Sequence, residues 1–174
     1  MYVVQSYSSI SYADKSKYPK LQVISPNEYY AEILQEDYAG QVSELTSVNQ
    51  YEYHYIVNRR TDASLAKHLG NIEEVERRHL EMIGELIRLL GFDPIYRSSF
   101  ENDKTEWSCR QIQYGGNIRE QLKCDLEAEY RSIRNYNMHK KLINDPYIKA
   151  ILARIIMDEY VHVHILEALI RGER

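Results

Sequence analysis

Six side chains with metal-binding chemistry lie where the helical pattern of this chain calls for core residues. They are four glutamates and two histidines, namely Glu44, Glu76, His79, Glu129, Glu159 and His162. Burying one unpaired carboxylate costs many kcal/mol, so four carboxylates in one core need compensation. Two divalent cations would balance four glutamate charges, and two neutral imidazoles would complete the ligand set. The pattern therefore predicts a dinuclear metal centre, with two ions per chain.

Both histidines follow a glutamate by three residues, as Glu76-x-x-His79 and Glu159-x-x-His162. Residues three apart share one face of a helix, so each motif offers an oxygen and a nitrogen to one site. Mixed carboxylate and imidazole ligation suits iron or manganese and leaves positions open for oxygen or peroxide. The simplest assignment gives each ion one glutamate–histidine pair and two shared glutamates. The bridges are Glu76 and Glu159, and the pairs are Glu44 with His79 and Glu129 with His162.

An alternative reading places the glutamates on the surface of helices whose phase differs, and makes the histidines hydrogen-bonded core residues. If the helices have the phase given below, that reading leaves four acids in the core with no cation to balance them. The metal centre is the favoured interpretation, and a non-catalytic bundle that binds partner proteins is the competing one.

Four helical patterns carry these residues. They span about residues 28–58, 62–90, 117–142 and 146–170. Apolar residues in each pattern recur at alternating spacings of three and four, which marks the face that is buried in a bundle. The candidate ligands lie on that face in all four. Residues 91–116 show no helical pattern and are long enough for a crossover along a bundle. The sequence predicts an all-α, antiparallel four-helix bundle with a long crossover between its second and third helices.

The glutamates of each predicted hairpin are equally far from its turn. Glu44 and Glu76 are equidistant from the break between the first two helices, and Glu129 and Glu159 are equidistant from Asn144. Each glutamate is thus about 15 residues, or ~23 Å, from its turn. This spacing predicts that all four carboxylates lie in one layer near the middle of the bundle.

Other residues are candidates for supporting roles around the metal centre. Tyr51 is the candidate catalytic residue, because it lies two helical turns after Glu44 and could donate a hydrogen bond to a ligating carboxylate. Tyr136 has the same relation to the third helix. Asp158 could orient a ligand histidine, or simply be a solvated acid. His54 and Asp37 could line a path for ions.

Composition limits the classes of function. A chain of 174 residues forms one domain by size, with residues 1–26 as an extended tail that could pack on a partner subunit and residues 27–174 as the bundle. The net charge of −4 argues against nucleic acid as a partner. We find no apolar run that could span a membrane and no secretion signal. Cys109 and Cys124 are read as free thiols, although one disulfide is possible, and the expected location is the cytoplasm.

The motifs resemble those of the ferritin-like superfamily, and specifically those of rubrerythrins and bacterioferritins. The segments that carry the resemblance are Glu44 to Tyr51, Glu76-x-x-His79, Asp125-Leu126-Glu127-Ala128-Glu129 and Asp158-Glu159-x-x-His162. The resemblance covers about residues 28–171. It implies a dinuclear iron site, or sometimes manganese, that reacts with oxygen or hydrogen peroxide.

Three departures from the family pattern matter. The chain lacks the rubredoxin-type cysteine domain of rubrerythrins, so an electron donor must be external. Ser132 stands where rubrerythrins have a further glutamate, and Arg77 stands where haem-binding bacterioferritins have methionine, so haem is not expected.

The expected function is that of a cytoplasmic oxidoreductase of the ferroxidase or peroxidase type, which protects against oxidative stress. The alternatives are peroxide dismutation like that of a manganese catalase, and iron storage in a multi-subunit shell. The expected partners are oxygen or hydrogen peroxide, an external electron donor and a second copy of the chain in a homodimer, with neither nucleic acid nor membrane. The resemblance alone does not choose among these activities, because one fold can serve several.

Overall fold

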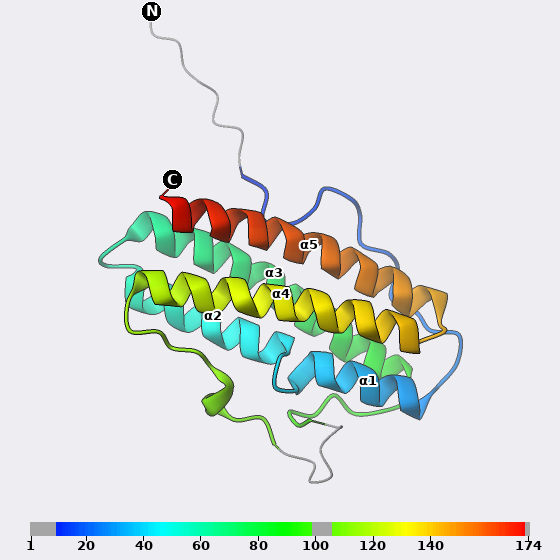
Figure 1. Ribbon diagram of the computed structural model, residues 1–174. Helices are drawn as coiled ribbons and strands as arrows, with labels where there is room; N and C mark the ends of the chain where they lie inside the picture. The colour runs from blue at the N-terminus through cyan, green and yellow to red at the C-terminus, as the bar shows by residue number, and fades with distance from the viewer. Residues whose placement is uncertain (1–9, 99–105, 173–174) are drawn as a thin grey trace, which may run out of the picture.

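The computed structural model describes residues 10–98 and 106–172, and in these residues it is an all-α bundle, as predicted (Figure 1). The helices are α1 (Glu28–Ala39), α2 (Glu44–Asn58), α3 (Ala63–Leu89), the 3-10 helix η1 (Cys109–Gln111), α4 (Ile118–Leu142) and α5 (Pro146–Arg171). The described residues contain no strand, only an isolated bridge between Arg97 and Glu106. None of these helices is apolar over enough of its length to cross a bilayer.

The helix predicted over residues 28–58 is in fact two helices, α1 and α2, so the prediction of one continuous helix is wrong. Gly40 ends α1, and a Cβ atom added there would lie only 2.6 Å from the carbonyl oxygen of Glu36. Ser43 then starts α2 as its N-cap, with its hydroxyl accepting a hydrogen bond from the Thr46 amide at 3.4 Å. The break makes Glu44 the first residue of α2, near the middle of the bundle.

Two helical hairpins face each other across the bundle. Helix α2 packs along α3, and α4 packs along α5; α2 then faces α4, and α3 faces α5. We call these two interfaces between hairpins the α2–α4 seam and the α3–α5 seam. Asp62, Asn117 and Asp145 cap the helices at the predicted starts, and Gly91, with a φ of 94°, follows α3 at its predicted end.

Apolar side chains fill the bundle in two clusters. The larger cluster includes Ile83, Leu86 and Ile151, and the smaller one includes Leu69 and Leu166. Each fully buried side chain of this kind contributes roughly 1.5–3 kcal/mol to folding. This apolar packing can offset the cost of the buried polar groups described below.

The crossover loop, residues 91–116, joins α3 to α4, and its described parts, residues 91–98 and 106–116, run over the side of the bundle formed by α1 and α2 (Figure 1). The Gln113 amide donates to the Gln50 side chain at 2.8 Å, and the Trp107 indole donates to the Thr46 hydroxyl at 3.0 Å. The long crossover between the second and third bundle helices is therefore confirmed.

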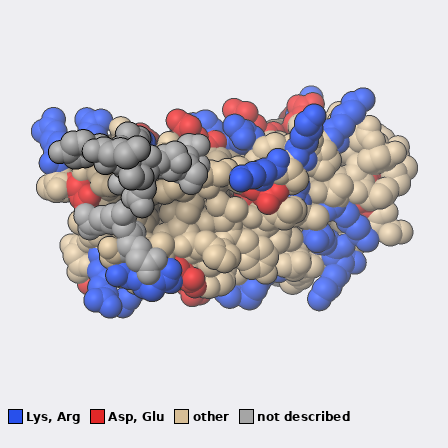
Figure 2. Space-filling view, turned by 90° about the horizontal axis from the view of Figure 1, so that it is seen from above, with Lys and Arg blue, Asp and Glu red and all other residues tan. Residues whose placement is uncertain are grey.

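Residues 10–26 form an extended segment, which we call the N-terminal strap, and they lie on the bundle of their own chain. The strap follows α5 (Figure 1), and its contacts reach α3 as well. Arg154 of α5 donates to the Ser16 carbonyl at 3.0 Å, and the Tyr12 hydroxyl lies 3.0 Å from Nδ1 of His68 on α3. In Figure 2, which shows this face, acidic and basic side chains are interspersed around a mostly uncharged centre. Residues 1–9 of the predicted tail lie outside the described residues.

Candidate metal centre

All six predicted ligand residues come together in the middle of the bundle. Their ligand atoms form two groups, within each of which every atom lies within 4.8 Å of the others. The groups are Glu44, Glu76, His79 and Glu159, and Glu76, Glu129, Glu159 and His162. Each of the six side chains is at most 3% exposed. The two groups share the two glutamates that the sequence predicts as bridges.

The first group surrounds Nδ1 of His79. This nitrogen lies 3.2 Å from Oε1 of Glu159, 3.7 Å from Oε2 of Glu76 and 3.8 Å from Oε2 of Glu44. Helix geometry explains the arrangement, because Glu76 and His79 are three residues apart on α3 and share its inner face.

The second group surrounds Nδ1 of His162 and uses the other oxygens of the shared carboxylates. This nitrogen lies 2.8 Å from Oε1 of Glu76, 3.6 Å from Oε2 of Glu159 and 3.6 Å from Oε1 of Glu129. Glu76 and Glu159 thus each present one oxygen to each histidine. That is how a carboxylate bridges two metal ions.

Several atoms of this cluster are buried without a hydrogen-bond partner, which tests whether the residues fit metal ions. They are Oε2 of Glu44, Oε1 of Glu76, both carboxylate oxygens of Glu159, and Nδ1 of His79 and of His162. Each such group costs about 1–3 kcal/mol if nothing satisfies it. Among the described residues, no lysine or arginine pairs with the four glutamates. A set of unsatisfied oxygen and imidazole donors aimed at shared space fits divalent cations.

The protonation of the metal-free cluster follows from its burial. Burial, followed by the Glu76 charge, raises the pKa of Glu44 well above its usual value. Burial, followed by the Glu159 charge, does the same to the pKa of Glu129. Burial would lower the pKa of His79, but the hydrogen bond to Asp158 and the nearby carboxylates of Glu159 and Glu76 raise it well above the usual value. Without cations the cluster retains protons, and bound ions would take the place of those protons.

Two buried tyrosines donate to the glutamates that belong to one group only. Tyr51 on α2 donates to Oε1 of Glu129 on α4, and Tyr136 on α4 donates to Oε1 of Glu44 on α2. The prediction that these tyrosines hydrogen-bond candidate ligands is confirmed, with each bond crossing from one hairpin to the other. Burial and the adjacent carboxylate raise the pKa of both hydroxyls well above the usual value, so both remain protonated donors.

Two buried histidine–aspartate pairs flank the centre. They are His54 with Asp125, at 2.9 Å, and His139 with Asp37, at 2.8 Å. Each histidine donates through Nδ1 and comes ten residues after the glutamate on its own helix, Glu44 or Glu129. These pairings were not predicted from the sequence, although the shared offset of ten residues is a visible signal of an internal two-fold repeat.

Asp158 accepts a hydrogen bond from the outer nitrogen of one candidate ligand histidine, in agreement with one of the two roles expected for it from the sequence. Its Oδ2 accepts from Nε2 of His79 at 3.0 Å and from the hydroxyl of Tyr18 at 2.6 Å. Burial would raise the pKa of Asp158, but hydrogen bonds from His79, Arg154 and Tyr18 lower it to about 2. Asp158 is therefore a buried, ionised acceptor and not a solvated acid.

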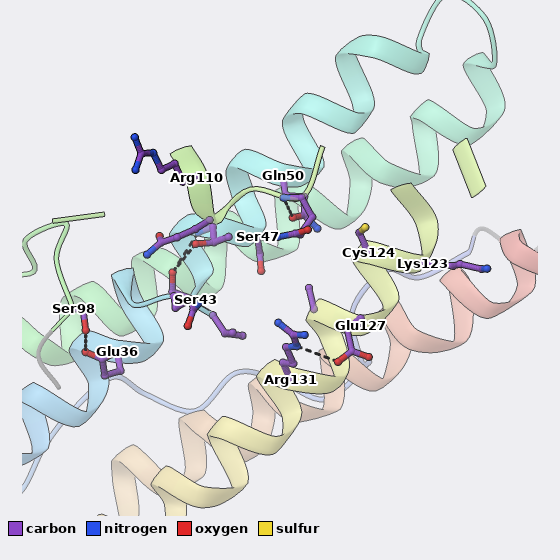
Figure 3. A pocket seen from close by; sticks show the side chains of 16 residues that line it. Glu36, Ser43, Ser47, Gln50, Ser98, Arg110, Lys123, Cys124, Glu127 and Arg131 are labelled. Carbon is purple, nitrogen blue, oxygen red and sulfur yellow. Dashed lines mark hydrogen bonds and ion pairs between the residues drawn. The ribbon is translucent and has the colours of Figure 1, made fainter. Parts of the chain in front are cut away.

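A cavity of about 710 Å³ lies beside the centre, between α2, α4 and the crossover loop (Figure 3). Ser43, directly before Glu44, and Ala128, directly before Glu129, both line it. Its other walls include Ser47, Gln50, Arg110, Cys124 and Arg131. The cavity thus adjoins the two helices that provide the non-bridging glutamates.

Comparison with known proteins supports the fold and the family. Among curated proteins, no sequence matches the chain significantly. The structure is similar to that of KatB, a manganese catalase from Anabaena, with a TM-score of 0.82 at 21% identity over 91% of this chain and 78% of KatB. It is similar to the Mycobacterium tuberculosis bacterioferritin BfrA, with a TM-score of 0.70 at 25% identity over 86% of this chain and 88% of BfrA. The bacterioferritin of Rhodobacter capsulatus gives a TM-score of 0.71 at 25% identity, over 86% of this chain and 88% of that protein. The ferritin-like domain profile matches residues 33–174, and the chain therefore belongs to the ferritin-like family.

Proposed function

We propose that this chain is a dinuclear, carboxylate-bridged metal oxidoreductase that reacts with oxygen or hydrogen peroxide. The observation that carries this proposal is the position of Glu76 and Glu159, each of which presents one oxygen to each of the two histidine nitrogens. Six protein ligands for two ions leave coordination positions open, which a reactive centre needs.

The proposed ligand sets are those that the two groups define. Glu44 and His79 would hold one ion, iron or manganese, Glu129 and His162 would hold the other, and Glu76 and Glu159 would contribute to both sites. Two such ions, when bound, supply redox electrons and Lewis acidity for the reduction of oxygen or peroxide.

The residues of this chain supply protons and a dry environment. Reduction of hydrogen peroxide to two water molecules takes up two electrons and two protons. Tyr51 is the proposed catalytic residue, because its protonated hydroxyl is hydrogen-bonded to Glu129 and can transfer a proton through that carboxylate. Tyr136 has the same position toward Glu44. The apolar clusters keep bulk water away from the buried centre.

The cavity beside α2 and α4 is the proposed route for the substrate. Uncharged molecules as small as oxygen and hydrogen peroxide need little space, and the cavity brings them beside Ser43 and Ala128. The strap covers the histidine side of the centre.

Two activities fit this centre. The ferroxidase or peroxidase type requires an electron donor, which we expect to be external, because the two cysteines of this sequence are too few for a four-thiolate redox site. Peroxide dismutation requires none, and the similarity of fold to KatB over most of this chain favours it as the second candidate. We expect a homodimer in the cytoplasm, a compartment that suits the free thiols of Cys109 and Cys124.

The test begins with metal-free protein loaded under anaerobic conditions with Fe(II) or Mn(II). We expect two ions per chain, and near-ultraviolet ferric absorption when the iron-loaded protein receives oxygen or peroxide. Release of oxygen from peroxide alone would identify dismutation, and a particle of hundreds of kilodaltons would identify storage. Fewer than one ion per chain in excess metal would contradict the proposal.

A matched pair of variants shows whether the buried cluster binds the ions. Glu129→Ala removes a proposed ligand, whereas Glu127→Ala removes a glutamate two residues earlier on the same helix, which is exposed and paired with Arg131 at 3.0 Å. We expect metal loss from the first variant only.

A further inference from the structure

The N-terminal strap holds the outer nitrogen of one candidate ligand directly. Nε2 of His162 lies 3.0 Å from the backbone carbonyl oxygen of Tyr12. A carbonyl oxygen can only accept, so Nε2 must carry the proton. The lone pair of neutral His162 is therefore on Nδ1, the nitrogen that faces Glu76, Glu129 and Glu159.

The strap holds the other histidine through one intermediate residue. Nε2 of His79 donates to Asp158, and two groups of the strap donate to the same carboxylate: the Asp14 amide at 2.7 Å and the Tyr18 hydroxyl at 2.6 Å. Nδ1 of His79 is again the nitrogen that faces the glutamates.

Arg154 on α5 ties the strap to this network. Its side chain is 4% exposed, and Nη1 lies 2.5 Å from Oδ1 of Asp158. Its other nitrogens donate to the carbonyls of Ser16 at 3.0 Å and Asp14 at 2.8 Å, and its guanidinium lies 4.1 Å from the centroid of the Tyr18 ring. A buried arginine with this many partners on the strap fixes the strap in one position.

The same segment closes the α3–α5 seam. Its contacts on the α3 side are His68, next to the Tyr12 hydroxyl, and Arg78, which lies 5.5 Å from the centroid of the Tyr18 ring. The part of the chain that matches the ferritin-like domain starts only at residue 33. The strap lies outside that matched domain, and it touches the supports of both histidines.

We propose that residues 12–18 are part of the metal centre, as positioning residues that set the tautomer and orientation of both ligand histidines and thereby the affinity for the ions. Hydrogen bonds to the outer nitrogen of a ligand histidine fix the ring and raise its basicity, and their loss typically weakens metal binding 10- to 100-fold. The inference rests on the proposed function, because it requires that ions bind.

The two supports differ, and this difference predicts unequal ions. His79 donates to an ionised carboxylate, which makes it the more basic ligand, whereas His162 donates to a neutral carbonyl. The ion at His79 should therefore bind more tightly than the ion at His162. When a chelator is added, the ion at His162 should dissociate first.

The test is a titration of the metal-free, full-length chain with Mn(II), in which free Mn(II) is counted by its electron paramagnetic resonance signal. Tyr18→Phe keeps the ring packed against Arg154 and removes the hydroxyl that holds Asp158. The matched control is Tyr30→Phe, which removes a hydroxyl that accepts from the Asn144 amide at 3.0 Å, away from the centre. Asp158→Asn is a second variant on the same path.

We expect two distinct dissociation constants for the natural chain. Tyr18→Phe should raise the tighter one about tenfold, the lower end of the range for such supports, and leave the weaker one within about twofold. Asp158→Asn should raise the same constant by up to about 100-fold. Tyr30→Phe should change neither, and the metal-free Tm of Tyr18→Phe should match that of Tyr30→Phe.

Three results would overturn the inference, and they differ from each other. Constants unchanged in Tyr18→Phe and Asp158→Asn would leave the metal centre standing and remove the role of the strap. Equal weakening of both ions together with a lower metal-free Tm would show that the strap acts only on stability. A natural chain that binds no Mn(II) or Fe(II) would refute the proposed function, and the inference with it.

Discussion

The two seams between the hairpins provide different halves of the metal centre. The α3–α5 seam contributes both histidines and is closed from outside by the strap. The α2–α4 seam contributes the non-bridging glutamates and their tyrosine donors, and it adjoins the cavity under the crossover loop. The difference suggests a division of labour, in which one seam holds the ions in place and the other admits the substrate and delivers protons.

This asymmetry is added to a bundle that is itself repetitive. On both α2 and α4 a glutamate is followed by tyrosine after seven residues and by histidine after ten, and the tyrosine bonds cross between the hairpins in both directions. The strap and the crossover loop break the symmetry, because each lies on one seam only. Segments outside the four helices therefore distinguish the two sides of the centre.

The largest expected effect is the loss of metal affinity when a glutamate shared by both ions is replaced, compared with a glutamate that belongs to one ion. Glu159→Gln removes a charge that both ions use and should lower the affinity for each ion by more than about 100-fold, beyond the range of residues that only support a ligand. Glu44→Gln should weaken binding of the ion at His79 only and leave the ion at His162 bound. The measurement is metal content after dialysis against buffered Mn(II). Equal losses in the two variants would contradict the bridging assignment.

Removing the ions should destabilise the chain, and more so at higher pH. Ions at 100 times their dissociation constant stabilise the folded state by about 2.7 kcal/mol per site. At roughly 2–4 °C per kcal/mol for a chain of this size, one site corresponds to a Tm increase of about 5–11 °C. Thermal unfolding with and without Mn(II), at pH 6 and pH 8, measures the increment.

The pH dependence follows from groups whose pKa is raised in the folded, metal-free chain. The raised pKa values of Glu44 and Glu129 contribute stability that is complete below their usual pKa of 4.5 and is lost as pH rises through the folded values. The raised pKa values of His79 and His162 contribute stability that is complete below their usual pKa of 6.5 and is lost as pH rises above it, through the folded values. The metal-free chain should therefore weaken from pH 6 to pH 8, and the increment from Mn(II) should grow. An increment that shrinks with pH would contradict this account.

The tyrosine side of the centre should affect rate more than affinity. Tyr51→Phe removes the proton donor to Glu129 and should slow the reaction with peroxide about 10- to 100-fold, while both metal affinities stay within a few-fold. Tyr130→Phe is the matched control, because Tyr130 also donates to a glutamate, Glu167 at 2.9 Å, outside the centre. A loss of metal from Tyr51→Phe, with the rate of the peroxide reaction per bound ion unchanged, would contradict the assignment of ion binding to one seam and proton delivery to the other.

The six candidate ligands could be predicted from the sequence because ligation imposes a local pattern. A side chain that binds an ion inside a bundle must face inward, so Glu76 and His79 had to fall on the 3–4 spacing of the apolar residues around them. The common height of the four glutamates followed from their distances to the turns. Both signals survive in a single sequence because they depend only on helix geometry.

The features that escaped prediction depend on the backbone or on long-range contacts. The break at residues 40–43 interrupts a pattern whose 3–4 spacing continues on both sides, so the pattern itself does not reveal that the helix ends at Gly40 and starts again after Ser43. The support of His162 is a carbonyl oxygen of Tyr12, a group that every residue carries and that leaves no trace in the sequence. The contacts of the strap with Asp158 join residues 140 and 144 positions apart, which no local pattern encodes.

The smallest expected effect tests the cavity as the substrate route. Ala128→Leu adds a larger side chain at a half-buried position that lines the cavity, without lowering helix propensity appreciably. It should slow the reaction several-fold, and more for an alkyl hydroperoxide than for hydrogen peroxide, because the larger substrate needs more of the space.

The control is Ala168→Leu, at a half-buried position on α5 that does not line the cavity. Metal content should stay at two ions per chain in both variants. Equal rates for Ala128→Leu and the natural chain with both substrates would place the route elsewhere. The α2–α4 seam would then contribute ligands and proton donors but would not admit the substrate. The two seams would differ only in the residues that they place around the ions.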